Sequence, residues 1–114
     1  MDVADNKDNT LGLSALTLDK LRSVFDKYAA IESVVIYGSR AKGNYKRGSD
    51  IDLTIKGPLL SFSELMQVEG DIDGLYLPYQ VDLSQYAALE NSDLLDHINR
   101  VGMTIYNKRQ RGNV

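Results

Sequence analysis

Apolar residues recur at helical spacing in three segments of the chain. The first helix is expected from Thr17, a suitable N-cap, and its buried stripe would comprise Leu18, Leu21, Val24, Phe25 and Tyr28. The second follows the sequence SFSE at 61–64, which is typical of a capping box, and ends at Gly74. The third follows a cap at Asn91 or Ser92 and ends at the next glycine. The pattern therefore predicts three amphipathic helices that each bury one face.

Short apolar runs between these segments predict strands. Residues 33–37 are β-branched and aromatic, and Gly38 ends the run. Segment 50–56 alternates strictly, so that one face carries Asp50, Asp52 and Thr54 and the other carries Ile51, Leu53 and Ile55. Segment 79–86 alternates in the same way, with Asp82 on its polar face, and 103–106 is expected to form a short last strand. The polar faces of two strands thus carry three aspartates.

This order of elements predicts a small α/β (α+β) domain. We expect a mixed sheet of about three to four strands with helices packed on one face, so that the carboxylates share the uncovered face. The domain is expected to span 13–107, between a flexible N-terminal tail at 1–12 and a flexible basic C-terminal tail at 108–114.

Composition excludes several classes of protein. The chain of 114 residues is 43% hydrophobic and 25% charged, as expected for one globular domain. It has no cysteine and a single histidine, His97, which excludes the usual zinc sites. The absence of a signal peptide and of an apolar run of ~20 residues predicts a cytoplasmic protein without a membrane span. A net charge of -3 argues against stable binding to nucleic acid.

The stretch from Val34 to Thr54 carries the candidate chemistry. Asp50 and Asp52 are two residues apart on a strand, so their Cα atoms lie about 6.6 Å apart with side chains on one side, which suits Mg²⁺. Such a pair is more often a solvated strand face, and we assign that interpretation to the other pair in the chain, Asp71-Ile72-Asp73.

The turn that precedes this pair has features of a phosphate site. Gly38 and Ser39 follow a strand, and their backbone N–H groups and the serine hydroxyl could hold phosphate oxygens. Taken alone, they would be an ordinary turn with a serine cap, and Gly43 would supply turn flexibility. Four cations follow, and they are either a solvated basic loop or ligands of a triphosphate: Arg40, Lys42, Lys46 and Arg47. Arg40 is the strongest candidate among them because it adjoins Ser39.

The sequence GSRAKG at 38–43, followed by SDIDL at 49–53, resembles the signature of the DNA polymerase β-like nucleotidyltransferase superfamily. More narrowly, it is similar to the minimal nucleotidyltransferase (MNT) family, small proteins encoded beside HEPN-domain partners. Asp82, in the sequence YQVDL, stands where the family has a third carboxylate. The resemblance implies that Asp50, Asp52 and Asp82 hold two Mg²⁺ ions with ATP as substrate, and that Asp82 helps to deprotonate the attacking hydroxyl. His97 is not needed as a base, and we interpret it as a partly exposed residue of the last helix.

The larger relatives carry further domains that grip the base and the acceptor, and the sequence shows no counterpart of them. The resemblance therefore implies a partner and a hetero-oligomer, in which AMP moves from ATP to a hydroxyl, a tyrosine, of a cognate HEPN-type RNase toxin, so that the protein acts as antitoxin. One alternative is a catalytic subunit that modifies a small molecule such as an aminoglycoside-like antibiotic. Another is an antitoxin that binds its toxin without catalysis. A third is an α/β domain with a coincidental cluster of charges.

Overall fold

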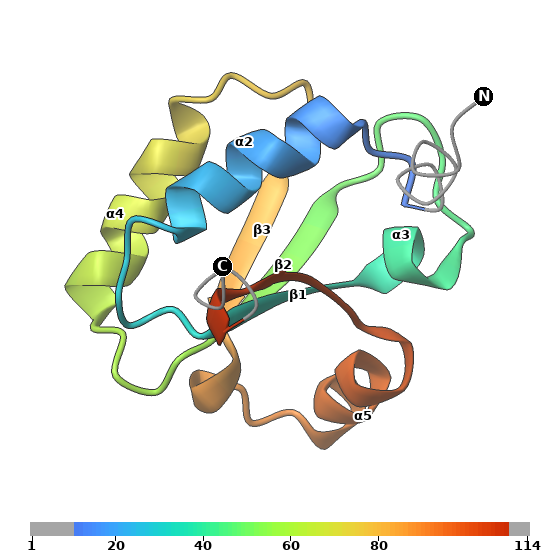
Figure 1. The fold of residues 1–114 in the computed structure, drawn as a ribbon. Coiled ribbons are helices and arrows are strands. Elements are labelled where there is room, and N and C mark those ends of the chain that lie inside the picture. The colour runs from blue at the N-terminus through green and yellow to red at the C-terminus, as the bar shows by residue number, and fades with distance from the viewer. Residues whose placement is uncertain (1–10, 110–114) are drawn as a thin grey trace.

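The computed structural model describes residues 11–109. Its elements follow the order α2 (Ala15–Phe25), β1 (Ser33–Tyr37), α3 (Gly38–Lys42), β2 (Ile51–Lys56), α4 (Phe62–Asp73), β3 (Val81–Gln85), the 3₁₀ turn η1 (Tyr86–Ala88), α5 (Ser92–Val101) and β4 (Met103–Asn107) (Figure 1). No helix within residues 11–109 is long and apolar enough to cross a membrane.

The four strands form one mixed sheet in the order β3-β2-β1-β4. Strand β1 pairs antiparallel with both β2 and β4, whereas β2 and β3 are parallel. Parallel neighbours need a crossover connection, and α4 supplies it. The predicted mixed sheet of the α+β class is confirmed, including the short last strand.

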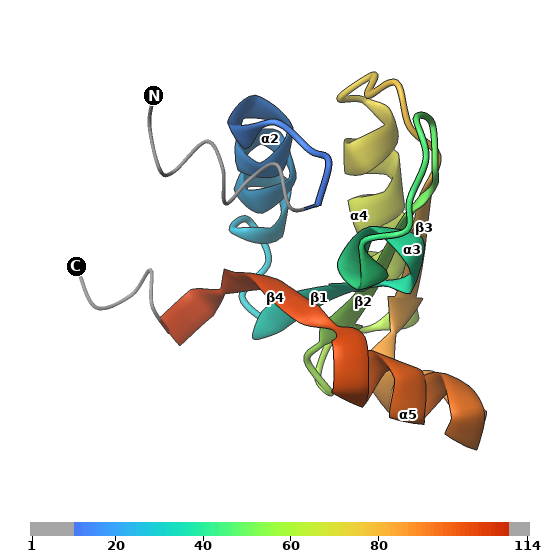
Figure 2. The ribbon, with the colours of Figure 1, turned by 90° about the vertical axis from the view of Figure 1, so that its right-hand side faces the viewer.

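Helices lie on both sides of this sheet. Figure 2 shows α2 and α4 on one side and α5 on the other. The main core lies between the sheet and the first two helices, where Leu21, Phe25 and Ile36 are fully buried. On the opposite side, Ile98 of α5 packs against Val35 and Tyr37 of β1. The expectation of helices on one face thus holds for α2 and α4, while α5 borders the second face and leaves its β2–β3 part to the carboxylates.

Local sequence signals explain where the helices begin. Ser61 and Glu64 form the predicted capping box at α4, with both reciprocal hydrogen bonds present. Asn91, rather than Ser92, caps α5. The predicted cap at Thr17 is wrong, because α2 begins earlier and the side chain of Ser14 accepts a hydrogen bond from the Thr17 N–H. An extended Ser14 backbone places its hydroxyl over the first turn, which a residue inside the helix cannot do.

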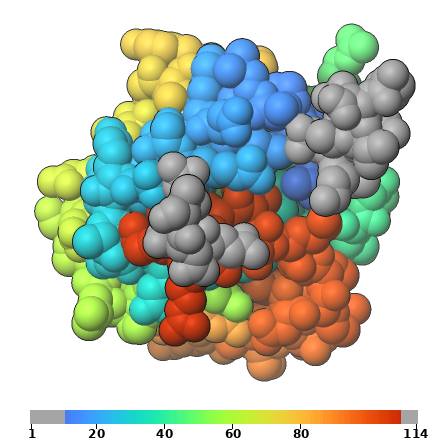
Figure 3. All heavy atoms as spheres, in the orientation of Figure 1, coloured from blue at the N-terminus to red at the C-terminus, as the bar shows by residue number. Residues whose placement is uncertain are grey.

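The first described helix, α2, lies beside the last strand, β4. In the space-filling view, blue atoms of the N-terminal part adjoin red atoms of the C-terminal part (Figure 3). The Arg22 Nε–H donates to the Ile105 carbonyl over 2.7 Å, which ties α2 to β4. Leu11, which the sequence analysis assigned to the flexible tail, is buried in the core, so the packed domain begins before residue 13. Of the predicted C-terminal tail, Lys108 is described and its N–H donates to the Glu32 carbonyl over 2.9 Å, whereas residues 1–10 and 110–114 lie outside the described residues.

Candidate active site

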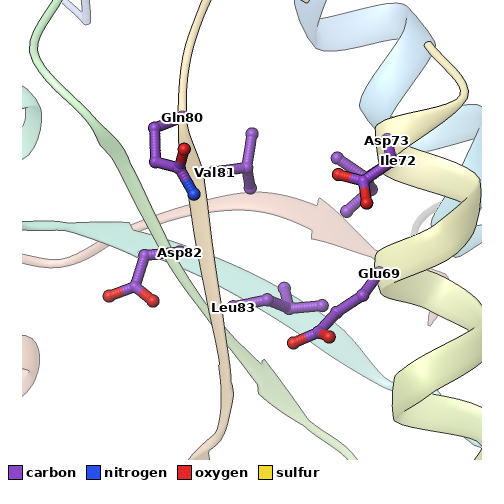
Figure 4. A pocket seen from close by; sticks show the side chains of 7 residues that line it. All are labelled: Glu69, Ile72, Asp73, Gln80, Val81, Asp82 and Leu83. Atoms are coloured by element: carbon purple, nitrogen blue, oxygen red, sulfur yellow. The ribbon is translucent and has the colours of Figure 1, made fainter. Parts of the chain in front are cut away.

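The parallel pairing of β2 and β3 brings two of the predicted aspartates side by side. Asp52 of β2 is in register with Asp82 of β3. Figure 4 shows the Asp82 side chain pointing away from α4, whereas Val81 and Leu83 point toward it. Asp52 shares this face, because its neighbours along β2, Ile51 and Leu53, are buried in the core on the α4 side. Two carboxylates from separate parts of the sequence therefore lie next to each other on the face opposite α4.

The third aspartate, Asp50, stands immediately before β2 and is exposed. Partial burial raises the pKa of the Asp52 carboxyl, and the negative charges of Asp82 and Asp50 raise it further. The carboxylates of Asp82 and Asp50 are thus both close enough to Asp52 to repel its charge. A bound cation would relieve this repulsion.

Gly38 lies against Asp52 at the end of β1. Its φ is +75°, and a Cβ added there would lie 2.2 Å from Asp52 Oδ2. Only glycine tolerates both the left-handed backbone and this close approach. The two halves of the predicted motif, Gly38-Ser39 and Asp50-Ile51-Asp52, are therefore brought into contact in the folded protein.

Ser39 occupies the first turn of α3 and is partly exposed. The helix ends at Gly43, whose φ is +88° and whose N–H donates to the Ser39 carbonyl over 2.9 Å. Gly43 thus closes the short helix in a left-handed conformation that favours glycine. Its predicted contact with phosphate stays a prediction, as does that of Ser39.

Arg40 requires a correction. The side chain is only 2% exposed, and its guanidinium donates hydrogen bonds to the backbone carbonyls of Leu11, Gly12 and Ser49. The rings of Tyr45 and Tyr79 lie over it, with centroids 5.2 and 4.8 Å from Cζ. A guanidinium used in this way joins the segments before Asp50 and Asp82 to α3. Because these hydrogen bonds all go to backbone carbonyls, Arg40 no longer ranks first among the candidate phosphate ligands.

The position of Arg40 beside Ser39 in the sequence predicted a phosphate ligand. The residues that bury its side chain, such as Leu11 and Tyr79, are distant in the sequence, so the local pattern did not reveal them. The other three cations of this region, Lys42, Lys46 and Arg47, are exposed. Their predicted contact with a triphosphate stays a prediction.

His97 is the site residue that the sequence analysis missed. It is partly exposed on α5, as expected, but its Nε2 accepts a hydrogen bond of 3.1 Å from the Gly38 N–H. The ring also meets Tyr37 edge to face, with centroids 6.1 Å apart. No signal in the sequence links a lone histidine to a turn 59 positions away. The Gly38 N–H is therefore occupied, and the phosphate donors predicted at this turn reduce to Ser39.

The sequence matches the family described as Polymerase beta, Nucleotidyltransferase over residues 19–111. That match includes every element from α2 to β4 that carries the site. The chain belongs to this nucleotidyltransferase family. The resemblance inferred from GSRAKG and SDIDL is confirmed at this level. No curated protein matches the sequence of this nucleotidyltransferase significantly.

Several solved structures share the fold of this nucleotidyltransferase. A chain of a toxin–antitoxin complex with AMP-PNP superimposes with a TM-score of 0.64 at 18% identity, over 82% of this chain and 76% of that one. A chain from the complex of a tri-AMPylated Shewanella oneidensis HEPN toxin with an MNT antitoxin gives 0.59 at 16% identity, over 86% and 76%. A putative nucleotidyltransferase from Sulfolobus solfataricus gives 0.57 at 16% identity, over 93% and 87%.

The residues of the candidate site fit a hard divalent cation. Asp50, Asp52 and Asp82 supply only oxygen ligands, which Mg²⁺ prefers, and the pKa of Asp52 is raised first by burial and then by the charges of Asp82 and Asp50. Within residues 11–109, however, no three acidic or histidine side chains converge into a ready-made metal cage. The carboxylates are spread along two strand ends, an arrangement that suits an ion shared with substrate phosphates.

A cavity of about 260 Å³ lies on the other side of β3 and is not this site. It is bounded by Glu69 and Asp73 of α4 and by the α4-facing side of β3 (Figure 4). Because the Asp82 carboxylate points away from this cavity, the candidate site lies on the opposite face of the sheet.

Proposed function

We propose that this nucleotidyltransferase moves AMP from ATP to a tyrosine hydroxyl of a cognate HEPN-type RNase toxin, in a Mg²⁺-dependent reaction, and so acts as its antitoxin. The observation that carries the proposal is the pairing of Asp52 with Asp82, beside Asp50 and against Gly38. The fold is shared with chains of toxin–antitoxin complexes, one solved with AMP-PNP and one with a tri-AMPylated toxin. These likenesses support the MNT assignment and the choice of acceptor.

The reaction exchanges the phosphoanhydride bond between the α- and β-phosphates of ATP for a phosphodiester bond to the acceptor. The acceptor oxygen attacks the α-phosphorus of ATP, the bond from that phosphorus to the bridging oxygen breaks, and pyrophosphate leaves. The hydroxyl proton passes to a carboxylate, which we assign to Asp82 because it is exposed on the reacting face. Ser39 holds a phosphate oxygen, and the exposed cations Lys42 and Lys46 balance the triphosphate charge.

Mg²⁺, held by Asp50, Asp52 and Asp82, would neutralise charge on the reacting phosphate when bound. Phosphoryl-type transfer asks for positioning and charge neutralisation more than for covalent chemistry from the protein. Three carboxylates and a serine are therefore sufficient side chains on this chain. The open, exposed setting of Asp50 and Asp82 lets a macromolecular acceptor approach, and we propose that the partner supplies the rest of the active site.

The proposal is tested by incubating the purified protein with Mg²⁺, the neighbouring HEPN-type protein and ATP radiolabelled at the α-phosphate. We expect label on the partner from α-labelled ATP and none from γ-labelled ATP. Asp50→Asn and Asp82→Asn should each reduce labelling by at least about 100-fold, as expected when a group that positions the reactants is lost. Asp73→Asn, in the second Asp-x-Asp sequence on the far side of β3, is the matched control and should label normally.

Mass spectrometry of the labelled partner should locate AMP on tyrosine. Absence of label with the wild-type protein, or equal label with Asp50→Asn, would contradict the proposal. Growth rescue from the toxin by an Asp50→Asn/Asp52→Asn double variant that still binds its partner would instead favour inhibition by contact alone. Label appearing only on an added aminoglycoside would favour the small-molecule acceptor.

A further inference from the structure

The His97–Gly38 hydrogen bond joins the last helix to the turn that carries Ser39. The Gly38 N–H donates to His97 Nε2 over 3.1 Å. An imidazole nitrogen that accepts is unprotonated, so the ring proton of neutral His97 is on Nδ1. The contact therefore uses one defined atom of the side chain, and a glutamine oxygen can occupy a similar place.

Helix α5 is held in place independently of this hydrogen bond. Ile98 is 2% exposed and packs against Val35 and Tyr37 on the sheet. At the end of α5, a Cβ on Gly102 would come within 2.6 Å of Val35 Cγ1, so the helix end lies directly on β1. The neighbouring His97 ring is further located by its edge-to-face contact with Tyr37, at an interplanar angle of 80°. The packing of α5 and of the ring therefore fixes the position of His97 Nε2 next to the Gly38 N–H.

Gly38 is contacted from two directions. The Asp52 carboxylate fills the space that a Cβ would occupy, and His97 holds the N–H. Without a Cβ, glycine would otherwise sample many peptide orientations. Ser39 follows Gly38 directly, so a fixed Gly38 peptide restricts where Ser39 presents its N–H and hydroxyl.

We infer that His97 is a positioning residue of the nucleotide site, which fixes the Gly38 peptide so that Ser39 and Asp52 face the same triphosphate. The inference rests on the proposed function for the identity of that ligand. His97 contacts no reacting atom in this role, and it acts through the peptide of Gly38. A lone histidine on the last helix thereby becomes part of the phosphate-binding machinery.

Three variants separate the acceptor atom from the ring. His97→Phe keeps a ring edge for Tyr37 but has no acceptor. His97→Gln restores an acceptor near the position of Nε2. Arg100→Gln is the matched control, because Arg100 is exposed on the same helix and pairs only with Asp96 within the described chain. Thermal melts establish that each variant is folded before it is compared.

Two measurements are made on the full protein without any acceptor. The first is the NMR signal and hydrogen-exchange rate of the Gly38 amide in the absence of metal and nucleotide. The second is the Kd for a non-hydrolysable ATP analogue with Mg²⁺, by calorimetry. For His97→Phe we expect about tenfold faster exchange at Gly38 and about tenfold weaker binding, whereas His97→Gln should stay within about threefold of wild type, because one net hydrogen bond corresponds to roughly one order of magnitude. Arg100→Gln should match wild type in both.

Equal binding by wild type and His97→Phe would overturn the inference, and so would a His97→Gln protein as weak as His97→Phe, since the ring rather than its acceptor would then matter. Failure of the proposed function gives a different result. If the wild type binds the analogue but labels no partner, the antitoxin proposal fails while the comparison of His97 variants still decides this inference. If the wild type binds no analogue, both fail.

Discussion

Gly38→Ala tests the close approach of the turn to the Asp52 carboxylate. The variant meets two separate penalties. The first is the left-handed backbone, φ +75°, which costs an alanine about 1–2 kcal/mol. The second is the 2.2 Å approach of the new Cβ to Asp52 Oδ2, whereas the Asp52 Cγ would be 3.2 Å away. Because the nearest atom is the end of a side chain, the carboxylate can rotate aside at little cost to stability.

These penalties have different consequences. The backbone strain should lower Tm by roughly 4–16 °C, given about 4–8 °C for each kcal/mol in a domain of this size. Displacement of the carboxylate by about 1 Å should reduce nucleotidyl transfer about 100-fold. Gly48→Ala is the matched control, because its φ is +84° but no atom lies within 4 Å of a Cβ there. We expect similar Tm losses in both variants and a large loss of rate only in Gly38→Ala.

The assay combines thermal unfolding with initial rates of transfer from α-labelled ATP under saturating Mg²⁺. Combination with Asp52→Ala completes a double-mutant cycle for stability. In that background, Gly38→Ala should cost no more than Gly48→Ala does, since the carboxylate is gone. A Gly38→Ala protein with the wild-type rate, or a Gly48→Ala protein that loses as much rate, would refute the reasoning.

Three further predictions concern Arg40, Asp82 and Tyr28. Arg40→Lys should lower the free energy of unfolding by about 1–3 kcal/mol in urea titrations, because one ammonium group cannot replace the guanidinium hydrogen bonds to both Leu11 and Ser49. An unchanged urea midpoint would contradict the role assigned to Arg40. Asp82→Asn should lower the pKa of Asp52, which NMR can follow. A carboxyl whose pKa is raised by folding makes the protein less stable as pH rises through that pKa, so without divalent cations the variant should melt higher than wild type at neutral pH. A lower Tm would count against charge repulsion. Partial burial and a hydrogen bond to Asp71 raise the pKa of Tyr28 from 10.0 to about 12, so the stability that this contact contributes is present below pH 10.0 and lost by about pH 12. Urea unfolding at increasing pH should therefore show a larger loss of stability in wild type than in Tyr28→Phe. Equal dependence of the unfolding free energy on pH in the two proteins would exclude this contribution.

Much of the fold follows from local patterns in the sequence. The alternation of Ile51, Leu53 and Ile55 with Asp52 and Thr54 correctly predicts which face of β2 enters the core, because a side-chain period of two leaves no other assignment. Capping chemistry likewise locates the start of α4. The match of residues 19–111 to a nucleotidyltransferase family shows that the short motif carried sufficient information for the family as well.

The features that were missed depend on contacts between distant segments. Arg40 stands beside Ser39 in the chain, but its partners, Leu11 and Tyr79, are far from it in sequence. Their contacts bury the guanidinium, so that Arg40 links separate segments of the fold. His97 reaches the site only because α5 packs on the second face of the sheet. Local propensity contains neither fact, since both arise from the tertiary arrangement.

Strand β3 carries Asp82 at the edge of the sheet, paired on one side only. An edge strand is hydrogen-bonded to one neighbour only, so we expect local separation of β3 from β2 to cost less free energy than global unfolding. Each such opening separates Asp82 from Asp52 while β1, β2 and β4 stay paired. A ligand that bridges the two carboxylates must therefore suppress this opening, and by linkage the local stability of β3 sets part of the ligand's affinity. The affinity of the site for such a ligand and the local opening of β3 are thus governed by the same equilibrium.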